Sequence, residues 1–282
     1  DQAGNLLNAG GIRCCASDIT LAEFRTLRGK MDGADTDAAT IESYLAGTPN
    51  FRTELYAGDG RGTLMSHAES IELFRELGVA MTPELTSPQV AMPFDGDYTQ
   101  RDYARQMIGE YRAAGVPPAR VWPQSFNYDD ILYWLEAAPD YAKQAVFLDN
   151  RYKTDVNDPA EIAALEPSMR QMAADGVNIL APPISMLLST RGGRIVPSEY
   201  AAAAREAGLQ LIAWTTERSG PLAKGSDDFY YTSVSDVIES DGDIFAVIDM
   251  LARDVGVIGL FSDWPATTTF YANCMDTAQP RD

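Results

Sequence analysis

The chain has 282 residues, of which 45% are hydrophobic and 10% aromatic, and this composition suits a packed globular protein rather than a disordered one. Its 41 acidic residues against 22 basic ones give a formal net charge of −19, which repels nucleic acids and anionic membrane surfaces. No apolar run approaches the roughly 20 residues that span a bilayer, so neither a nucleic-acid partner nor a membrane span is expected.

Residues 1–50 carry fewer periodic signals than the rest and are predicted to be an irregular N-terminal part or insertion. Within them, residues 17–24 predict a short helix with Asp18 or Thr20 as its N-cap. The chain starts at Asp1 without an initiating methionine, which leads us to expect processing or truncation upstream.

The three cysteines, Cys14, Cys15 and Cys274, have no metal-type spacing. In an oxidising compartment one of the adjacent pair could bridge Cys274 or a cysteine on a lost segment, whereas in a reducing one all three would be buried thiols. The oxidising alternative is favoured, and it places the protein in the periplasm or outside the cell.

From residue 51 onward, predicted helices and strands alternate. Ser66 and Glu69 form a capping box that opens a helix ended by Gly78, and the strand 79–81 follows and runs toward Glu84. Further helices are predicted over 99–114, 129–137, 198–207 and 243–255, with another opening at Asp158-Pro159. Further strands are predicted at 121–123, 145–148, 177–180, 211–213 and 257–261. Repeats of ~25–48 residues are typical of parallel βα units.

Six such units fit either a doubly wound sheet or an incomplete eightfold barrel. No G-x-G-x-x-G follows a strand and no G-x-x-x-x-G-K-[ST] occurs, so the nucleotide-binding version has little support. The sequence therefore predicts an α/β fold, a (β/α)8 TIM barrel forming a single domain over 1–282. Its βα units would occupy 51–282, and one or two N-terminal βα units would be absent from this chain.

Polar and aromatic residues follow the predicted strands, at the edge where α/β proteins place their chemistry. Five segments in chain order carry a resemblance: 63–71 (TLMSHAESI), 82–85 (TPEL), 122–126 (WPQSF), 214–220 (WTTERSG) and 259–265 (GLFSDWP). Together they resemble a branch of the glycerophosphodiester phosphodiesterase family. The resemblance implies a (β/α)8 barrel that uses a divalent cation, Ca²⁺ or Mg²⁺, to split glycerophosphodiesters into glycerol 3-phosphate and an alcohol.

The resemblance also implies roles for particular residues. Glu84 matches a metal-binding carboxylate, while Gln124, Ser125, Phe126 and Trp214 match segments that face the substrate. Each has a structural alternative. Glu84 could cap a helix or pair with an arginine, Phe126 could plug the barrel, and Trp214 could be a core residue that uses its N–H internally.

The sequence departs from the family pattern in ways that leave the catalytic residues unknown. The family's His-Arg-Gly, its Glu-x-Asp metal pair and its second histidine are missing from the matching region, and Thr86 stands where the family has a phosphate-binding lysine. The single histidine, His67, lies in the first turn of a capped helix and is predicted to be structural. We expect the missing groups on an N-terminal segment, which would be a separate fragment of the same protein, a partner chain or an unsequenced region.

The first functional hypothesis is metal-dependent hydrolysis of a small glycerophosphodiester, an activity that would need the missing N-terminal segment. The alternatives are a non-catalytic binding barrel of the same fold and a phospholipid-cleaving barrel of the sphingomyelinase D kind. The residues leave open the head-group preference, the native cation and the oligomeric state.

Overall fold

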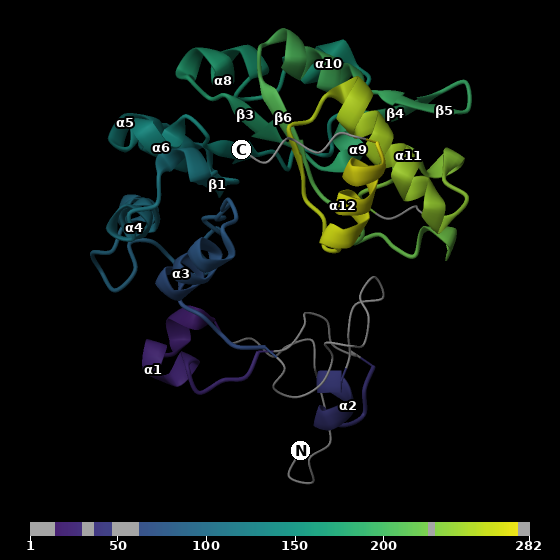
Figure 1. Ribbon diagram of the computed structural model, residues 1–282. Coiled ribbons are helices and arrows are strands. Elements are labelled where there is room, and N and C mark those ends of the chain that lie inside the picture. The colour runs from purple at the N-terminus through teal and green to yellow at the C-terminus, as the bar shows by residue number, and fades with distance from the viewer. Residues whose placement is uncertain (1–14, 30–36, 47–61, 225–228, 276–282) are drawn as a thin grey trace.

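The protein is described by a computed structural model that covers residues 15–29, 37–46, 62–224 and 229–275 (Figure 1). A parallel five-stranded sheet in the order β1-β2-β3-β6-β7 forms its centre. The strands are β1 (Gln124–Ser125), β2 (Val146–Leu148), β3 (Ile179–Ala181), β6 (Gln210–Ala213) and β7 (Gly259–Leu260). Isolated parallel bridges from Met81 to Val121 and from Glu84 to Gln124 add the segment 81–84 beside β1.

These neighbours follow one another in the order of the sequence. A doubly wound sheet reverses its strand order near the middle, whereas each strand of a (β/α)8 barrel lies beside the strand that precedes it in the sequence. The α/β class and the parallel sheet expected from the sequence are therefore confirmed. The closed eight-stranded ring is not found in the described part of the chain, where the 81–84 segment and β7 are the two edges of the sheet.

The helices lie in an arc that runs in Figure 1 from α3 and α4, over α8 and α10, to α11 and α12. The first part of the chain contributes η2 (Ala16–Asp18), α1 (Leu21–Phe24), α2 (Ile41–Ala46), α3 (His67–Leu77), α4 (Gln100–Ala113), η4 (Pro118–Arg120), α5 (Tyr128–Ala137) and α6 (Pro139–Ala142). The rest contributes α7 (Pro159–Ala163), α8 (Met169–Asp175), α9 (Ile184–Leu187), α10 (Glu199–Glu206), η5 (Leu222–Lys224), η6 (Ser235–Val237), η7 (Asp241–Asp243), α11 (Ile244–Asp249), the π-helical η8 (Met250–Val255) and α12 (Pro265–Cys274). Among the described residues, no helix is long and apolar enough to cross a bilayer.

The helix starts follow the sequence signals closely. The Ser66 hydroxyl accepts from the Glu69 N–H and the Glu69 carboxylate accepts from the Ser66 N–H, so the predicted capping box opens α3. Gly78 ends that helix at φ 67°, a left-handed conformation that costs glycine little. Of the two candidate caps near residue 20, Thr20 is the one that caps α1.

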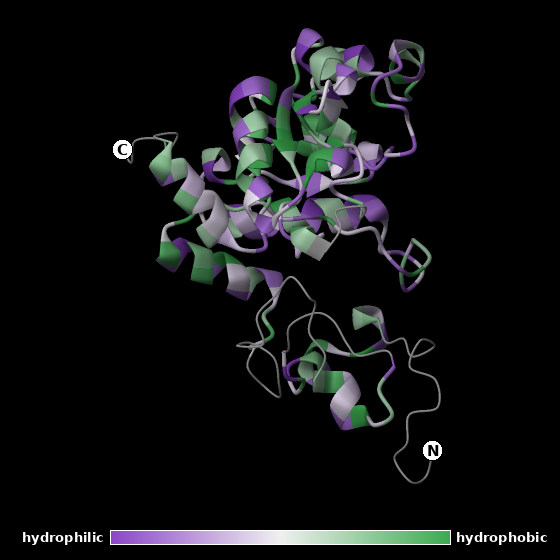
Figure 2. Ribbon diagram, turned by 90° about the vertical axis from the view of Figure 1, so that its right-hand side faces the viewer, coloured by the Kyte–Doolittle hydropathy of each residue, from purple (hydrophilic) through white to green (hydrophobic). Residues whose placement is uncertain are grey.

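The inner strands β2 and β3 are buried on both faces, which is why they read as continuous apolar runs. Alternate residues point to opposite sides: Val146 and Leu148 belong to one hydrophobic cluster, and Phe147 between them belongs to the other. The larger cluster packs between sheet and helices around the fully buried Trp134. The smaller cluster lies on the other face of the sheet. Figure 2 shows that the strands consist mostly of hydrophobic residues, drawn in green.

A β-hairpin and a terminal helix were absent from the sequence prediction. The hairpin, β4 (Leu188–Arg191) with β5 (Arg194–Pro197), is antiparallel and closes with Arg191 opposite Arg194. Gly192 and Gly193 turn it at φ 60° and 71°, and this Gly-Gly pair between apolar runs is a hairpin signal that the βα interpretation overlooked. Helix α12 follows Trp264 and begins at Pro265, so proline lies in its first turn.

The predicted structural role of His67 agrees with its surroundings. Its Nδ1 lies 2.7 Å from a carboxylate oxygen of Glu110 on α4, and its ring meets Tyr111 edge-on at a centroid distance of 5.0 Å. The imidazole thus joins α3 to α4. Of the cysteines, Cys274 is an exposed free thiol at the end of α12 and does not bridge Cys15, while Cys14 lies outside the described residues.

Candidate functional site

A cavity of about 320 Å³ lies at the carboxyl ends of the parallel strands, and we call it the mouth pocket. It is lined by Glu84, Gln124, Phe126, Leu148, Trp214, Thr215, Arg218, Tyr230, Phe261, Ser262 and Asp263. Four residues singled out from the sequence, Glu84, Gln124, Phe126 and Trp214, are therefore brought together although they span 131 positions from 84 to 214.

One wall of the mouth pocket offers hydrogen-bond acceptors. Glu84 and Gln124 are neighbours across a parallel bridge, and the Glu84 carboxylate accepts from the Thr86 hydroxyl at 3.3 Å. Gln124 is only 4% exposed, and its Oε1 is buried without a hydrogen-bond partner in the described structure. A buried unsatisfied acceptor costs about 1–3 kcal/mol, so a native one calls for an explanation, and a ligand bearing hydroxyls or a cation supplies it.

A second wall is aromatic. Phe126 and Trp214 meet edge to face with their ring centroids 5.8 Å apart, and Tyr230 lies 5.8 Å from Trp214. The Trp214 indole donates to the Ala181 carbonyl at 2.7 Å, so its N–H is used internally, as the structural alternative proposed. Its ring nevertheless lines the cavity, so the internal hydrogen bond does not remove Trp214 from the mouth pocket.

Ser125, in contrast, is not brought to the pocket. It is fully buried, its hydroxyl donates to Asp130 at 2.9 Å and it accepts the Asn127 N–H at 3.0 Å. Alternation along β1 sends Gln124 to the cavity side and Ser125 to the helix side, where it orders the start of α5. Burial raises the pKa of the Asp130 carboxyl, although the hydrogen bonds from Gln100 and Ser125 act to lower it.

The loops after β6 and β7 are tied together by Glu217, which the sequence analysis did not identify. Glu217 is 8% exposed; it accepts from the Thr216 hydroxyl at 2.5 Å, the Ser262 hydroxyl at 2.8 Å and the Asp263 N–H at 2.8 Å. Three donors onto one buried carboxylate satisfy its charge. Nothing in the run Thr215 to Arg218 distinguishes the buried glutamate from the exposed arginine beside it.

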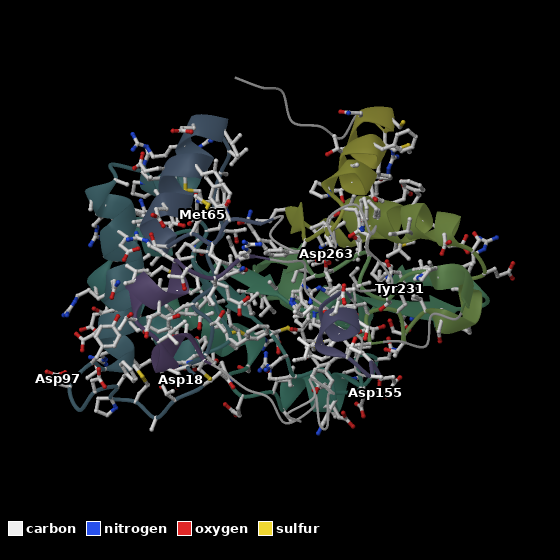
Figure 3. The ribbon with its side chains drawn as sticks, turned by 90° about the horizontal axis from the view of Figure 1, so that it is seen from below. Asp18, Met65, Asp97, Asp155, Tyr231 and Asp263 are labelled. Atoms are coloured by element: carbon white, nitrogen blue, oxygen red, sulfur yellow. The ribbon has the colours of Figure 1, made fainter. Side chains whose placement is uncertain are left out.

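Asp263 lines the mouth pocket, and Trp264 after it occupies the N-cap position of α12. Its carboxylate accepts from the Thr215 hydroxyl at 3.1 Å and lies 3.3 Å from the Arg218 Nε. Figure 3 marks Asp263 in the segment between β7 and α12. The two edges of the sheet thus contribute Glu84 and Asp263 to one cavity.

Asp149, also at a strand end, is held in a buried hydrogen-bonded cluster away from the mouth pocket. It is fully buried; the Arg151 side chain donates to its two carboxylate oxygens at 2.8 and 2.6 Å, and the Tyr200 hydroxyl donates at 2.5 Å. Burial disfavours the charged form of Arg151. The hydrogen bonds to Asp149 and the charge of that carboxylate together outweigh burial and raise the Arg151 pKa. Burial first, and then Asp149, raises the pKa of Tyr200 well above its usual range.

The expected cation can be tested against these side chains. The Glu84 carboxylate and the Gln124 amide are oxygen donors of the kind that Ca²⁺ and Mg²⁺ prefer. Within the described ranges, no three His, Cys, Asp or Glu side chains form a group able to hold a metal ion. The described residues therefore do not complete a divalent-cation site by themselves.

Comparison with known proteins places these observations in context. No family model matches the chain. Among solved structures, a glycerophosphodiester phosphodiesterase from Parabacteroides distasonis is similar at a TM-score of 0.49 and 14% identity, covering 86% of this chain and 74% of that one. A candidate glycerophosphodiester phosphodiesterase from Galdieria sulphuraria gives a TM-score of 0.47 at 16% identity, covering 85% and 73%.

A curated relative is far more similar in sequence. An extracellular protein of the fungus Arthroderma benhamiae is 49% identical over 249 residues, which cover 87% of this chain and 100% of that protein. With this identity over nearly the whole of both chains, the protein belongs to the same family as the extracellular protein of Arthroderma benhamiae.

Proposed function

We propose that this chain forms the substrate pocket of a metal-dependent glycerophosphodiester phosphodiesterase, which releases glycerol 3-phosphate and an alcohol. The observation that carries the proposal is the convergence of Glu84, Gln124, Phe126 and Trp214 on one cavity at the carboxyl ends of the strands. These are the residues to which the sequence resemblance gives roles, and the cavity edge is where barrel enzymes bind substrates.

The proposal gives each of these side chains a task. The buried Gln124 Oε1 accepts a glycerol hydroxyl, which removes the cost of an unsatisfied acceptor. The rings of Phe126 and Trp214 cover the glycerol carbons and exclude water from that side of the ligand. Glu84 supplies one oxygen ligand to Ca²⁺ or Mg²⁺, and the remaining ligands come from outside the described residues.

The proton-transfer groups also come from elsewhere. The chain's single histidine, His67, bonds to Glu110 between α3 and α4 and does not line the mouth pocket. We propose that these groups lie on further βα units, which would fill the gap between the 81–84 edge and the β7 edge of the sheet. An N-terminal segment or a separate fragment would supply those units. Cleavage of the diester needs an acid to protonate the leaving alkoxide.

The experiment is an assay of glycerophosphocholine hydrolysis by the protein as its gene encodes it, with Ca²⁺ or Mg²⁺ and with EDTA. We expect cation-dependent release of glycerol 3-phosphate that Glu84→Ala lowers by at least ~100-fold, the loss of roughly 2.7 kcal/mol of transition-state stabilisation. An inert wild-type protein whose cation affinity is the same as that of Glu84→Ala refutes the proposal.

The position of His67 also favours a second candidate, a binding barrel without catalysis. Such a protein would bind glycerol 3-phosphate in the same pocket and hydrolyse nothing, whatever cation is added. Sphingomyelin and lysophosphatidylcholine, included as substrates in the same assay, separate both candidates from a barrel that cleaves intact phospholipids. Following the name of its relative, we propose that the protein acts outside the cell.

A further inference from the structure

A second cavity lies beside the mouth pocket, and we call it the side pocket. It has a volume of about 500 Å³ and is enclosed by the 15–17 segment, the loop 86–98 and Tyr103 on α4. We infer that the side pocket binds the alcohol arm of the phosphodiester and that this alcohol is apolar. The inference rests on the proposed function, which brings a glycerophosphodiester to the mouth pocket.

The side pocket is uncharged and largely apolar. Although the chain has a net charge of −19, no Asp, Glu, Lys, Arg or His is found among the described residues that line this cavity. Its apolar walls come from Val90, Met92, Phe94, Tyr98 and Tyr103. Such walls favour a ligand group that gains free energy by leaving water, and no carboxylate among them balances a cationic head group.

The two pockets meet at the segment 84–86. Glu84 lines the mouth pocket and Thr86 lines the side pocket, and the Thr86 hydroxyl donates to the Glu84 carboxylate at 3.3 Å. Leu85 between them is 2% exposed and belongs to neither wall. A ligand bound at Glu84 is therefore within reach of both cavities.

A phosphodiester carries two arms, one on each ester oxygen of its phosphate. The proposed function places the phosphate at the cation bound by Glu84. It places the glycerol arm against Gln124, Phe126 and Trp214. The alcohol arm then extends from the phosphate away from these three residues, and the side pocket beyond Thr86 is the cavity that receives it.

The aromatic walls of the side pocket are held in place by the protein itself. Phe94 and Tyr98 exchange backbone hydrogen bonds of 2.8 and 2.9 Å. The Tyr98 hydroxyl donates to the Gln106 Oε1 on α4 at 2.6 Å, so the polar end of this ring is paired while its apolar body lines the pocket. Walls that need no reordering lower the free-energy cost of binding an apolar arm.

The test is isothermal titration, in Ca²⁺, of the protein as its gene encodes it with sn-glycerol 3-(alkylphosphonates). In these ligands a P–C bond joins the alkyl arm to phosphorus, so the arm is not released by hydrolysis. The arms are methyl, butyl and hexyl. The variants are Val90→Asp, which adds a charge to the side pocket, and Met92→Ser, which removes apolar surface from it.

The matched control is Leu73→Asp on α3, whose side chain is 38% exposed and lines neither pocket. Melting temperatures of all variants verify folding. We expect the affinity of wild type to rise about fourfold for each methylene that enters the side pocket. Val90→Asp and Met92→Ser should bind the methyl compound as wild type does and lose much of the gain with chain length, whereas Leu73→Asp should keep it.

Three outcomes of this series overturn the inference. The first is a wild-type affinity that does not change with the length of the arm. The second is a full gain with chain length in both Val90→Asp and Met92→Ser. The third is an equal loss of that gain in Leu73→Asp, which would trace the effect to the added charge rather than to the side pocket.

Two further ligands test which arm enters and whether it is apolar. The isomer 1-O-butylglycerol 3-methylphosphonate carries the butyl chain on the glycerol arm and should gain no affinity that depends on Val90. The 3,3-dimethylbutyl and 2-(trimethylammonio)ethyl phosphonates share a shape and differ in charge, and the uncharged one should bind more tightly. A Val90-dependent gain for the isomer, or tighter binding of the charged arm, overturns the inference.

A hydrolysis assay distinguishes this inference from the proposed activity. Binding that strengthens with the alkyl arm, in a protein that does not hydrolyse glycerophosphocholine, supports the inference and counts against the activity. Cation-dependent hydrolysis, together with binding that is indifferent to the length of the arm, supports the activity and overturns the inference.

Discussion

Glu84 and Asp263 come from opposite edges of the parallel sheet and line the same cavity of about 320 Å³. In a flat sheet, the spacing of neighbouring strands would hold the first and sixth of six strands roughly 24 Å apart. A cavity of this size does not bridge such a span, so the sheet is curved as the staves of a barrel are. This curvature brings the acceptor wall at Glu84 and Gln124 to the Arg218–Asp263 pair.

Gln124 is predicted to lower the free energy of unfolding and to raise the affinity for the ligand. Gln124→Met keeps the length of the side chain and removes the buried unsatisfied Oε1, and it gives up only the long donation of 3.5 Å from Nε2 to the Thr82 carbonyl. The free energy of unfolding should therefore stay level or rise by up to ~3 kcal/mol. Affinity for glycerol 3-phosphate should fall. Urea denaturation and titration measure the two quantities.

Gln144 is the matched control for that substitution. Its Nε2 donates to the Val121 carbonyl at 3.1 Å, so Gln144→Met should lower the unfolding free energy by about 1 kcal/mol. A structural role for Gln124 would be indicated if Gln124→Met lost stability to the same degree and bound the ligand as wild type does.

Asp149 is predicted to be essential to the fold. Asp149→Ala leaves the Arg151 guanidinium and the Tyr200 hydroxyl without their buried partner, and should cost about 3–5 kcal/mol of unfolding free energy. Asp140→Ala breaks the exposed pair with Arg112 and should cost less than ~1 kcal/mol. Thermal or urea unfolding compares them, and similar losses would show that burial of the Asp149 cluster contributes little.

Much of this fold could be predicted from residue patterns, because the signals are local. The Ser66–Glu69 capping box, Gly78 and the apolar strands are signals that predict the order of helices and strands from neighbouring residues alone. The mouth pocket could be predicted only in part. Glu84, Gln124, Phe126 and Trp214 follow strands and carry the resemblance, whereas the burial of Glu217 depends on contacts with the distant Ser262 and Asp263.

Ser125 shows the limit of reasoning from position alone. It lies at a strand end, as Gln124 does, yet the strand's alternation turns it toward Asp130 and the start of α5. A register known to one residue is needed to separate the two, and a two-residue strand does not reveal it in sequence.

Asp130 is predicted to make acid conditions less damaging to the fold. Because burial raises its pKa above the ordinary value, the folded protein binds this proton more tightly than the unfolded chain does. Its contribution to the unfolding free energy is therefore most favourable below about pH 4 and is lost as the pH rises through the raised pKa.

The measurement compares wild type with Asp130→Asn, whose side chain does not titrate, by urea unfolding at several pH values from 7 to 4. The stability of wild type relative to the variant should increase as the pH falls. A difference that stays constant or shrinks on acidification would mean that the hydrogen bonds from Gln100 and Ser125 outweigh burial.

Glu84 is predicted to bind Ca²⁺ or Mg²⁺. Glu84→Gln keeps the shape of the side chain and removes its charge, so cation affinity measured by titration should fall by at least ~10-fold. Glu72→Gln, on the exposed surface of α3 beside Arg75, should leave the affinity unchanged. Equal losses in both variants would point to a general effect of net charge rather than to a ligand at Glu84.

The central claim is that the mouth pocket holds a phosphorylated glycerol, and a crystal structure of the protein with sn-glycerol 3-phosphate tests it most directly. We predict electron density between the Glu84 and Asp263 edges, with a hydroxyl at the Gln124 Oε1 and the glycerol carbons against Phe126 and Trp214. Density in the larger cavity of about 770 Å³ beside Ile179 and Ile212, or an empty mouth pocket at saturating ligand, would contradict it.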